Sequence, residues 1–169
     1  GKKILFGNKE FAIFYVDVDS KNIVEIDRSN QLKNDEFYWE QSDYSWSPDS
    51  KWITYSLTNF NRNNVVYVYS LDQKKKFALT DDFYDNLYPS FDANGKYLYY
   101  VSSRNFDIHM DFYEDNHIIA TPQQVMVVQL RDNETPPFED PLTDEENKSD
   151  EQFRIDIDGI ATRTYPLPT

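Results

Sequence analysis

The chain of 169 residues contains no cysteine, which excludes disulfides, thiol catalysis and Cys-ligated zinc together. A chain without cysteine is compatible with either an oxidising or a reducing compartment. Glycine is scarce, with four residues, so tight turns have to use Asn, Asp, Ser and Pro. No apolar run approaches the roughly 20 residues that a membrane-spanning helix needs, so no membrane span is expected. Residues 1–30 also lack the pattern of a signal peptide.

Cations are few relative to acids. Lys and Arg number 17 against 30 Asp and Glu, and the formal net charge is −13. A phosphate backbone would be repelled by this charge, so no nucleic-acid partner is expected. Much of the excess lies in residues 139–151 (EDPLTDEENKSDE), within a stretch at 133–152 that we interpret as a solvated acidic linker. An anionic surface can attract cationic peptides, but it also simply keeps a protein soluble.

Aromatic residues are abundant, with 13 Tyr, 12 Phe and 3 Trp. Together with runs of Val and Ile they favour strands, since these side chains suit a pleated and half-buried surface. Alternation along a strand predicts that half of them fill the space between neighbouring sheets, and some of the others could line a peptide channel. The aromatic residues in question are Phe14, Tyr15, Tyr67, Tyr69, Tyr97, Tyr99 and Tyr100.

Two sequence elements recur along the chain. Residues 46–56 read WSPDSKWITYS, residues 91–102 read FDANGKYLYYVS, and a third copy begins at residue 1 with GKKILF. The second element reads IFYVDV at residues 13–18, VYVYSL at 66–71 and VMVVQL at 125–130. Four short strands in about 40–45 residues are typical of a β-propeller blade. An all-β sandwich also has short strands, but it does not require a sequence repeat.

The turn of the first element has a defined chemistry. In residues 47–50 (SPDS), Pro48 presets φ at the second position and Asp49 suits the third, so Ser50 should take the left-handed conformation of a three-residue hairpin with a bulge. Gly95 occupies the same place in the next copy, and Gly1 would occupy it in the first. We therefore expect backbone strain of about 1 kcal/mol at Ser50.

These residues resemble a known repeat. Residues 43–53 (DYSWSPDSKWI) look like the WD40-like, or PD40, repeat that TolB-type and tricorn-protease propellers share. Residues 79–91 resemble the link between consecutive blades in that group. The pattern departs at Ser50, where Gly is usual, and at residues 92–94 (DAN), where Ser-Pro-Asp is commoner.

The order of the later segments is similar to that of tricorn-type proteases where their first propeller ends and the second begins. A blade ending in VSSRNF (101–106) precedes an insertion, then residues 125–130, PPF at 136–138, the acidic stretch and IDIDGI at 155–160. The resemblance implies a domain of a large, self-compartmentalising serine peptidase. In that family the propellers are non-catalytic and are thought to filter or channel peptides to a separate peptidase core.

No residue of this chain matches that core, so we carry over no catalytic residue, no cofactor and no metal ligand. The partners that the resemblance implies are peptides or unfolded polypeptides, through the parent protein. One alternative function is a TolB-like propeller that serves as a protein-interaction module with no protease attached. Another is an enzyme in its own right, such as a propeller glycosidase or lyase.

One cluster has the composition of a metal site. His109 and His117, with Asp111, Glu114 and Asp115, could ligate zinc or another divalent ion. The spacing matches no helical site, however, and the segment reads as an insertion at the edge of a blade. A solvated loop is the better interpretation.

Other candidates for chemistry have structural explanations. Ser102 and Ser103 lie near a His, but without a G-x-S-x-G pattern we interpret them as hydroxyls that bond the backbone at a strand end. Carboxylates in one interblade link could act on glycosides, but turn and cap roles fit their position better. They are Asp81, Asp82 and Asp85. Three arginines could receive peptide carboxylates or be solvated surface, namely Arg62, Arg104 and Arg154.

The predicted fold is all-β: a partial β-propeller of about three four-stranded antiparallel blades. Its expected segments are blades at 1–33, 34–80 and 81–132 with an insertion at 103–124, an acidic linker at 133–152, and a strand pair at 153–169 that completes a blade or starts the next propeller. We expect the first unit to begin inside its hairpin turn and to lack its innermost strand. Because propellers have about four to eight blades, the ring is open, and its exposed faces predict self-association.

Overall fold

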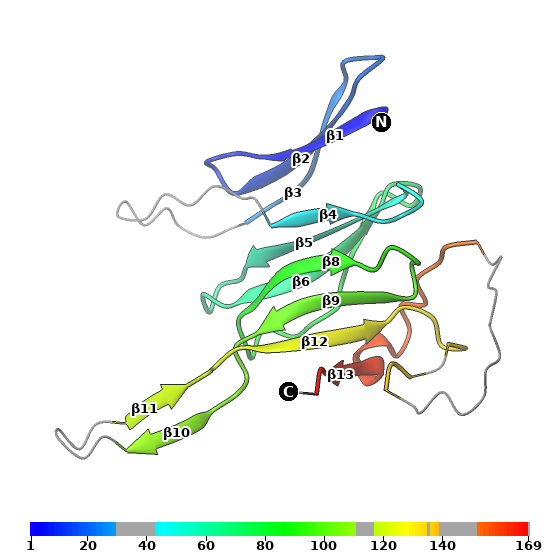
Figure 1. The fold of residues 1–169 in the computed structure, drawn as a ribbon. Helices are drawn as coiled ribbons and strands as arrows, with labels where there is room; N and C mark the ends of the chain where they lie inside the picture. The colour runs from blue at the N-terminus through cyan, green and yellow to red at the C-terminus, as the bar shows by residue number, and fades with distance from the viewer. Residues whose placement is uncertain (30–42, 111–116, 135, 139–151, 169) are drawn as a thin grey trace.

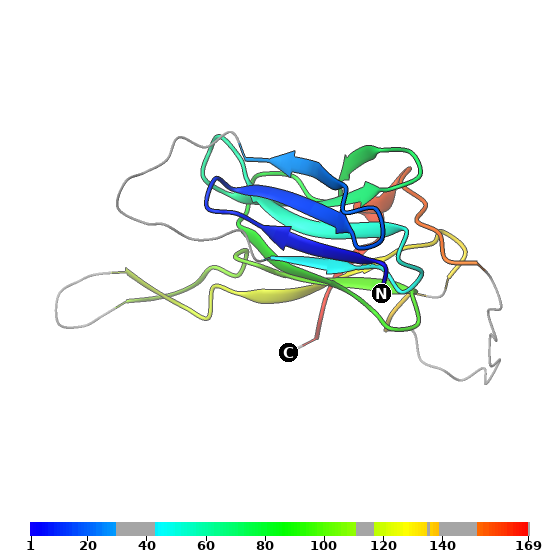
Figure 2. The same cartoon turned by 90° about the horizontal axis from the view of Figure 1, so that it is seen from above.

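The computed structural model describes residues 1–29, 43–110, 117–134, 136–138 and 152–168. Three antiparallel sheets stack face to face in the order of the sequence (Figure 1), and the view from above looks down this stack, so that the sheets overlap (Figure 2). The predicted all-β class is therefore confirmed. No helix in the described ranges is long and apolar enough to cross a membrane.

Each sheet is built from strands that are close together in the sequence. The first sheet has the order β1-β2-β3, the second β4-β5-β6-β7 and the third β13-β12-β9-β8. Their bounds are β1 Lys3–Gly7, β2 Ala12–Asp17, β3 Ile23–Arg28, β4 Tyr44–Trp46, β5 Trp52–Thr58, β6 Asn64–Ser70, β7 Lys75–Ala78, β8 Asn86–Phe91, β9 Tyr97–Ser102, β12 Gln124–Gln129 and β13 Thr164–Pro166. Among the described residues, the first sheet therefore has one strand fewer than the second and third sheets, as expected for the first unit.

Backbone hydrogen bonds show that the three units are equivalent. The carbonyl of Lys2 accepts a bond from the N–H of Val18, that of Lys51 from Leu71 and that of Lys96 from Leu130, at 2.8, 3.0 and 3.0 Å. In all three units the lysine follows the turn position taken by Gly1, Ser50 and Gly95. The repeat read from the sequence is therefore a structural repeat, and residues can be compared between blades position by position.

The predicted turn forms in two of these units. Ser50 has φ 60° and Gly95 has φ 70°, both left-handed. The N–H of each bonds the carbonyl three residues earlier, in Ser47 and Asp92, at 2.9 and 3.0 Å. The side chain of Asp49 braces the first turn, because its Oδ1 accepts bonds from the Ser47 hydroxyl and from the N–H of Lys51.

Replacing Ser50 by glycine is expected to stabilise the protein by about 1 kcal/mol, because glycine adopts a positive φ without a steric penalty. The Asp49 bonds do not involve the Ser50 side chain, so they should persist. Urea-induced equilibrium unfolding measures the change. A lower unfolding midpoint for Ser50→Gly would contradict the turn assignment.

The apolar side chains lie between the sheets in two clusters. On β5, Ile53, Tyr55 and Leu57 face the first sheet, while on β6 Val66 and Val68 face the third. We call the cluster between the first two sheets the first interblade core, formed by Ile13, Ile53, Tyr55, Leu57 and Tyr69. The second interblade core contains Val66, Val68, Leu79, Leu98, Tyr100, Met126, Val128, Leu130, Ile155 and Ile160. Full burial of a Val, Leu, Ile or Met side chain stabilises the folded state by roughly 1.5–3 kcal/mol, so packing between the blades holds the stack together.

The segment between β9 and β12 contains a hairpin. Strands β10 (Asp107–Met110) and β11 (His117–Ala120) pair with each other in a separate two-stranded sheet that projects from the third sheet (Figure 1). Its base is closed by a bond from the N–H of Asn105 to the carbonyl of Pro122, at 3.0 Å. The prediction of a loop for this segment was therefore wrong over residues 107–110 and 117–120, where backbone pairing forms.

The C-terminal segment corrects one strand prediction. The strand expected at residues 153–159 does not form, whereas the second expected strand forms as β13, on the outer edge of β12. The alternation Phe153, Ile155, Ile157 resembles a strand because these side chains all reach the second interblade core. Within the described part of the chain, the backbone of this segment instead bonds the residue that follows β12 through the Asp156 N–H, which donates to the Leu130 carbonyl at 2.9 Å. The turn at Gly159 (φ 70°) and the 3₁₀ helix η1 (Ile160–Arg163) lead into β13. The division of the chain into domains stays a prediction.

Candidate functional site

Both histidines of the candidate metal cluster, His109 and His117, lie on the β10–β11 hairpin. His109 is opposite Ile118, and His117 is opposite Met110 in the register. Asp111, Glu114 and Asp115 lie outside the described residues. Within the part of the chain that the structure describes, no group of three or more acidic or His side chains is arranged to hold a metal ion.

Ser102, the serine considered as a nucleophile, is fully buried at the end of β9. Its hydroxyl donates to Asn86 Oδ1 at 2.8 Å and accepts from Arg104 Nε at 2.8 Å. The Arg104 guanidinium also lies 4.9 Å from the ring centroid of Tyr84. Both Ser102 and Arg104 are therefore engaged in joining β9 to the link before β8. For Ser103 a backbone bond is present, from its N–H to the Asp85 carbonyl at 2.9 Å.

Of the three interblade carboxylates, Asp81 caps a local turn as predicted, whereas Asp82 and Asp85 accept bonds from a neighbouring segment. Asp81 Oδ1 accepts from the N–H of Phe83 at 3.2 Å, and Asp82 Oδ2 accepts from the Asn59 amide at 3.0 Å. Asp85 Oδ1 accepts two bonds from Asn64, from its backbone N–H and from its side-chain amide. These bonds join the β5–β6 turn to the link into the third sheet, so the carboxylates organise the junction between blades.

Asp43 makes a second junction between these blades, and sequence reasoning did not single it out. Its Oδ2 accepts from the Ser56 hydroxyl on β5 and from the N–H of Tyr88 on β8, the latter at 2.7 Å. Tyr88 has a positive φ of 57° in an irregular part of β8, which directs its N–H toward the carboxylate. Burial raises the pKa of Asp43, and the bonds from Ser56 and Tyr88 oppose that rise.

A polar network joins the first two blades. The Tyr55 hydroxyl donates to Asp27 Oδ2 at 2.9 Å, and Lys76 Nζ lies 2.7 Å from the same oxygen. Burial, with the nearby charge of Asp27, raises the pKa of Tyr55 and keeps the phenol protonated. A cavity of about 150 Å³ opens beside the network, with Arg28, Tyr67 and Lys76 in its wall. Because Asp27, Tyr55 and Lys76 come from three distant segments, no local sequence pattern indicated the network.

The aromatic residues divide between the two interblade cores and the outer faces. Tyr69 and Tyr100 are buried in the cores, and Tyr15 and Tyr67 pack against the first core. Phe14 stacks on Phe6, with ring centroids 5.4 Å apart, and is not part of the first interblade core. Tyr99 is 36% exposed. The predicted division between core and outward side chains is confirmed.

The remaining two arginines lie at the surface. Arg62 sits in the β5–β6 turn with φ 71°. Arg154 pairs with Asp156, at 3.3 Å between Nε and Oδ1, and donates to Asn133 Oδ1 at 2.9 Å. Arg154 thus helps to hold the C-terminal segment against the residues that follow β12.

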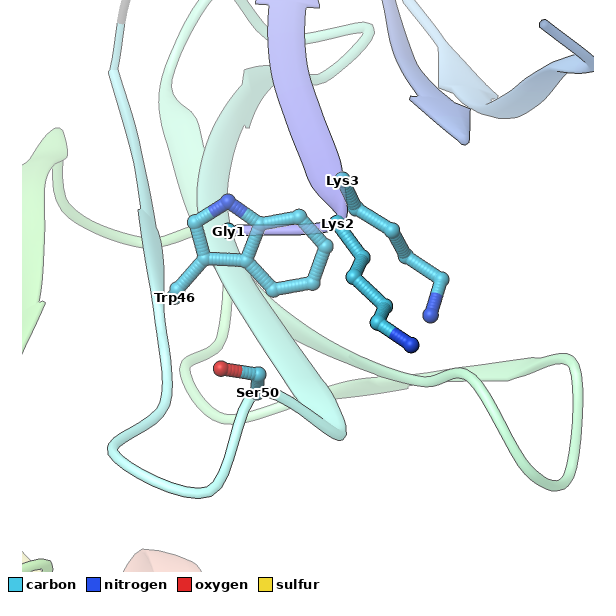
Figure 3. Close-up of a pocket in the computed structure, with 5 residues that line it drawn as sticks. All are labelled: Gly1, Lys2, Lys3, Trp46 and Ser50. Atoms are coloured by element: carbon cyan, nitrogen blue, oxygen red, sulfur yellow. The ribbon is translucent and has the colours of Figure 1, made fainter. Parts of the chain in front are cut away.

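A pocket of about 250 Å³ opens between the first two sheets, next to the Ser50 turn (Figure 3). Gly1, Lys2 and Lys3 line it from the start of the first sheet, and Trp46 and Ser50 line it from the second. It combines two ammonium groups with an aromatic side chain and a hydroxyl. Trp46 and Ser50 belong to the WSPDSKWITYS turn motif, which by its residues indicated a turn and no chemistry. The repeated lysine after the turn was the signal that could have pointed to this end of the blades.

Comparisons with known proteins place this stack of blades in context. The model of the family described as "Tricorn protease second beta propeller domain" matches residues 1–169. A tricorn protease homolog of Saccharolobus solfataricus is 29% identical over 171 residues, which cover 99% of this chain and 15% of that protein. The crystal structure of the tricorn protease superimposes with a TM-score of 0.81 at 25% identity, over 100% of this chain and 16% of that one. A TolB structure from Agrobacterium tumefaciens, described as putative, shares the fold with a TM-score of 0.51 at 18% identity, over 76% of this chain and 42% of that one.

These matches confirm a partial β-propeller of the tricorn type. The chain spans less than a fifth of the length of the tricorn homolog that it matches. The family model describes a second propeller along the whole chain, so it does not support the placement of the early blades at the end of a first propeller.

Proposed function

The chain belongs to the family of tricorn protease second β-propeller domains, and from this premise we propose that it is a non-catalytic propeller segment that gates or scaffolds peptide access to a peptidase core outside this chain. The family match over residues 1–169 carries the proposal. The propeller contributes shape and surface, and the parent protein contributes peptide-bond hydrolysis.

The use of the polar side chains supports a non-catalytic role. Nucleophilic catalysis needs a hydroxyl within reach of a base that a third group orients. Ser102 instead bonds Asn86 and Arg104, and the interblade carboxylates accept bonds from asparagines and backbone N–H groups. These contacts stabilise the junctions between blades.

The alternative of a TolB-like interaction module rests on the fold alone, because the TolB structure is 18% identical to this chain. The family match favours a protease context over it. Among the described residues, no cluster of side chains favours the other alternative, an independent propeller glycosidase or lyase.

Two measurements test the proposed function. The parent gene downstream of Thr169 should encode a PDZ-like region and a peptidase core; a stop codon soon after Thr169 would favour the interaction module. The purified chain should not hydrolyse fluorogenic peptides. Hydrolysis above the buffer rate that disappears in Ser102→Ala would overturn the non-catalytic assignment.

We further propose that copies of the chain associate through the outer face of the first sheet. Ile4 and Ile23 are 57% and 61% exposed there, and large exposed apolar faces are uncommon on monomeric proteins. Light scattering should show a mass that rises with protein concentration, and Ile23→Glu should reduce that rise. A compact monomer at all concentrations would contradict the association.

A further inference from the structure

The pocket beside Ser50 has a counterpart one blade further along the chain. Lys2, Lys51 and Lys96 occupy equivalent positions, as their matching backbone bonds show. Trp46 and Phe91 are also equivalent, because the residue after each donates its N–H to the carbonyl at the start of the next strand, in Trp52 and Tyr97. The pocket walls at residues 1–3, Trp46 and Ser50 therefore correspond to residues 50–52, Phe91 and Gly95.

In that counterpart an aromatic side chain fills the space. The ring of Phe153 lies edge-on to Phe91, with centroids 5.8 Å apart and planes at 83°. It lies so close to Gly95 that a Cβ on that glycine would be 2.6 Å from Phe153 Cδ2. Phe153, Phe91 and Trp52 all pack against the second interblade core. This position between two blades thus accepts a phenyl ring from an extended segment.

The pocket between the first two blades differs from its counterpart in three ways. Lys3 stands where the counterpart has Trp52, which leaves more room and adds a positive charge. Ser50 stands where the counterpart has Gly95, which narrows the opposite wall. The space itself measures about 250 Å³, and the described residues that line it do not fill it.

The charge at the pocket differs in sign from that of the whole chain. The net charge is −13, yet the side chains of Lys2 and Lys3 extend in the same direction from the start of the first sheet (Figure 3). Lys3 faces Asp17 in the β1–β2 register and contributes to the lowered pKa of Asp17, after the bonds from Ser20. A ligand carboxylate beside these ammonium groups would be attracted.

We propose that this pocket binds an aromatic side chain of an extended peptide, and that a carboxylate next to that residue pairs with Lys2 or Lys3. Phe153 occupies the equivalent space in the counterpart, so the pocket is expected to accept an aromatic ring. The positive charges of Lys2 and Lys3 are the reason to expect a carboxylate beside that ring. The inference rests on the proposed function in one respect, that the ligand is a peptide. It adds a site and a preference for aromatic residues flanked by acids.

The binding test uses capped pentapeptides derived from residues 152–156. The probe has the sequence QFDID, in which Asp replaces Arg154. Titration into the ¹⁵N-labelled chain should shift the indole N–H signal of Trp46 saturably, with the signal of Trp52 as internal reference; Trp46→Phe assigns the signal. A QADID peptide should lose the shift. A QFNIN peptide should bind about fivefold more weakly, as should QFDID in high salt, because exposed ion pairs are weak and screened.

Variants at Ser50 and the lysines test the pocket directly. Gly and Asn both tolerate the left-handed conformation, so Ser50→Gly should deepen the pocket and tighten binding of QFDID, whereas Ser50→Asn should narrow it and weaken binding. Of Lys2→Ala and Lys3→Ala, the variant that removes the partner of the carboxylate should weaken binding about fivefold. Lys9→Ala, in the turn at the other end of the β1–β2 hairpin, is the charge-matched control and should leave binding unchanged.

The outcomes separate the pocket from the proposed function. If QFDID shifts other signals and leaves Trp46 unmoved, or if Ser50→Asn binds it unchanged, the pocket assignment is wrong while peptide handling stands. If the Trp46 signal moves with protein concentration in the absence of peptide, the occupant is a second copy and the proposal is overturned. Absence of binding for every peptide would count against both.

Discussion

Replacing Gly95 by alanine is expected to lower the free energy of unfolding by about 2–4 kcal/mol, which combines backbone strain with overpacking. Gly95 has φ 70°, a conformation that costs alanine about 1 kcal/mol. The added Cβ would also lie 2.6 Å from Cδ2 and 3.0 Å from Cε2 of Phe153. The ring cannot retreat freely because it packs edge-on against Phe91. Urea-induced equilibrium unfolding measures the loss.

Gly159→Ala is the matched control for this prediction. Gly159 has the same φ of 70°, but its Cβ would meet Arg163 Nη1 at 3.6 Å and Thr162 Oγ1 at 3.8 Å, which are ordinary contacts. This variant should cost about 1 kcal/mol. In the background of Phe153→Ala, the cost of Gly95→Ala should fall toward the same value. Equal costs for Gly95→Ala and Gly159→Ala would show that Phe153 does not press on Gly95.

Replacing Leu98 by alanine is expected to lower the free energy of unfolding by about 3 kcal/mol. Leu98 lies on β9, is 0% exposed and belongs to the second interblade core. Its removal leaves a cavity between two sheets whose backbones are held by their own ladders, so the walls can close only in part. The same unfolding measurement gives the value.

Ile23→Ala is the comparison for Leu98, because Ile23 is 61% exposed on the first sheet. At protein concentrations where the chain is a monomer, this variant should change the free energy of unfolding by less than about 0.5 kcal/mol. A cost for Ile23→Ala that approaches that of Leu98→Ala would mean that the outer face is covered. A small cost for Leu98→Ala would contradict the packing between the second and third sheets.

The strands and their turns could be predicted from local patterns. Alternating aromatic and β-branched residues at 66–71 and 125–130 have the period of a strand, and both segments form β-strands. Ser50 was expected in a left-handed conformation from the Ser-Pro-Asp before it, and its φ of 60° agrees. The recurrence of a lysine after each turn predicted equivalent units, and the backbone bonds of Lys2, Lys51 and Lys96 agree.

The contacts between blades could not be predicted in the same way. Across the blade interface, Asp27 on β3 bonds Tyr55 on β5 and Lys76 on β7, so each comes from a different strand. Their proximity depends on how two sheets stack, and a local sequence pattern carries no information about that. The failed strand prediction at 153–159 has a related cause. Alternation of Phe153, Ile155 and Ile157 specifies which side chains face a core, but it does not specify whether the backbone finds a free strand edge to pair with.

The sequence by itself determined the all-β class, the repeated unit, the turn conformations and the exclusion of cysteine chemistry, because each depends on residue type and short spacing. The tertiary structure alone decided that Phe153 fills the space between the second and third blades, and that its counterpart beside Trp46 and Ser50 is an open pocket with two lysines. Both depend on residues about 45–100 positions apart meeting across a sheet interface, where packing rather than periodicity selects the neighbours.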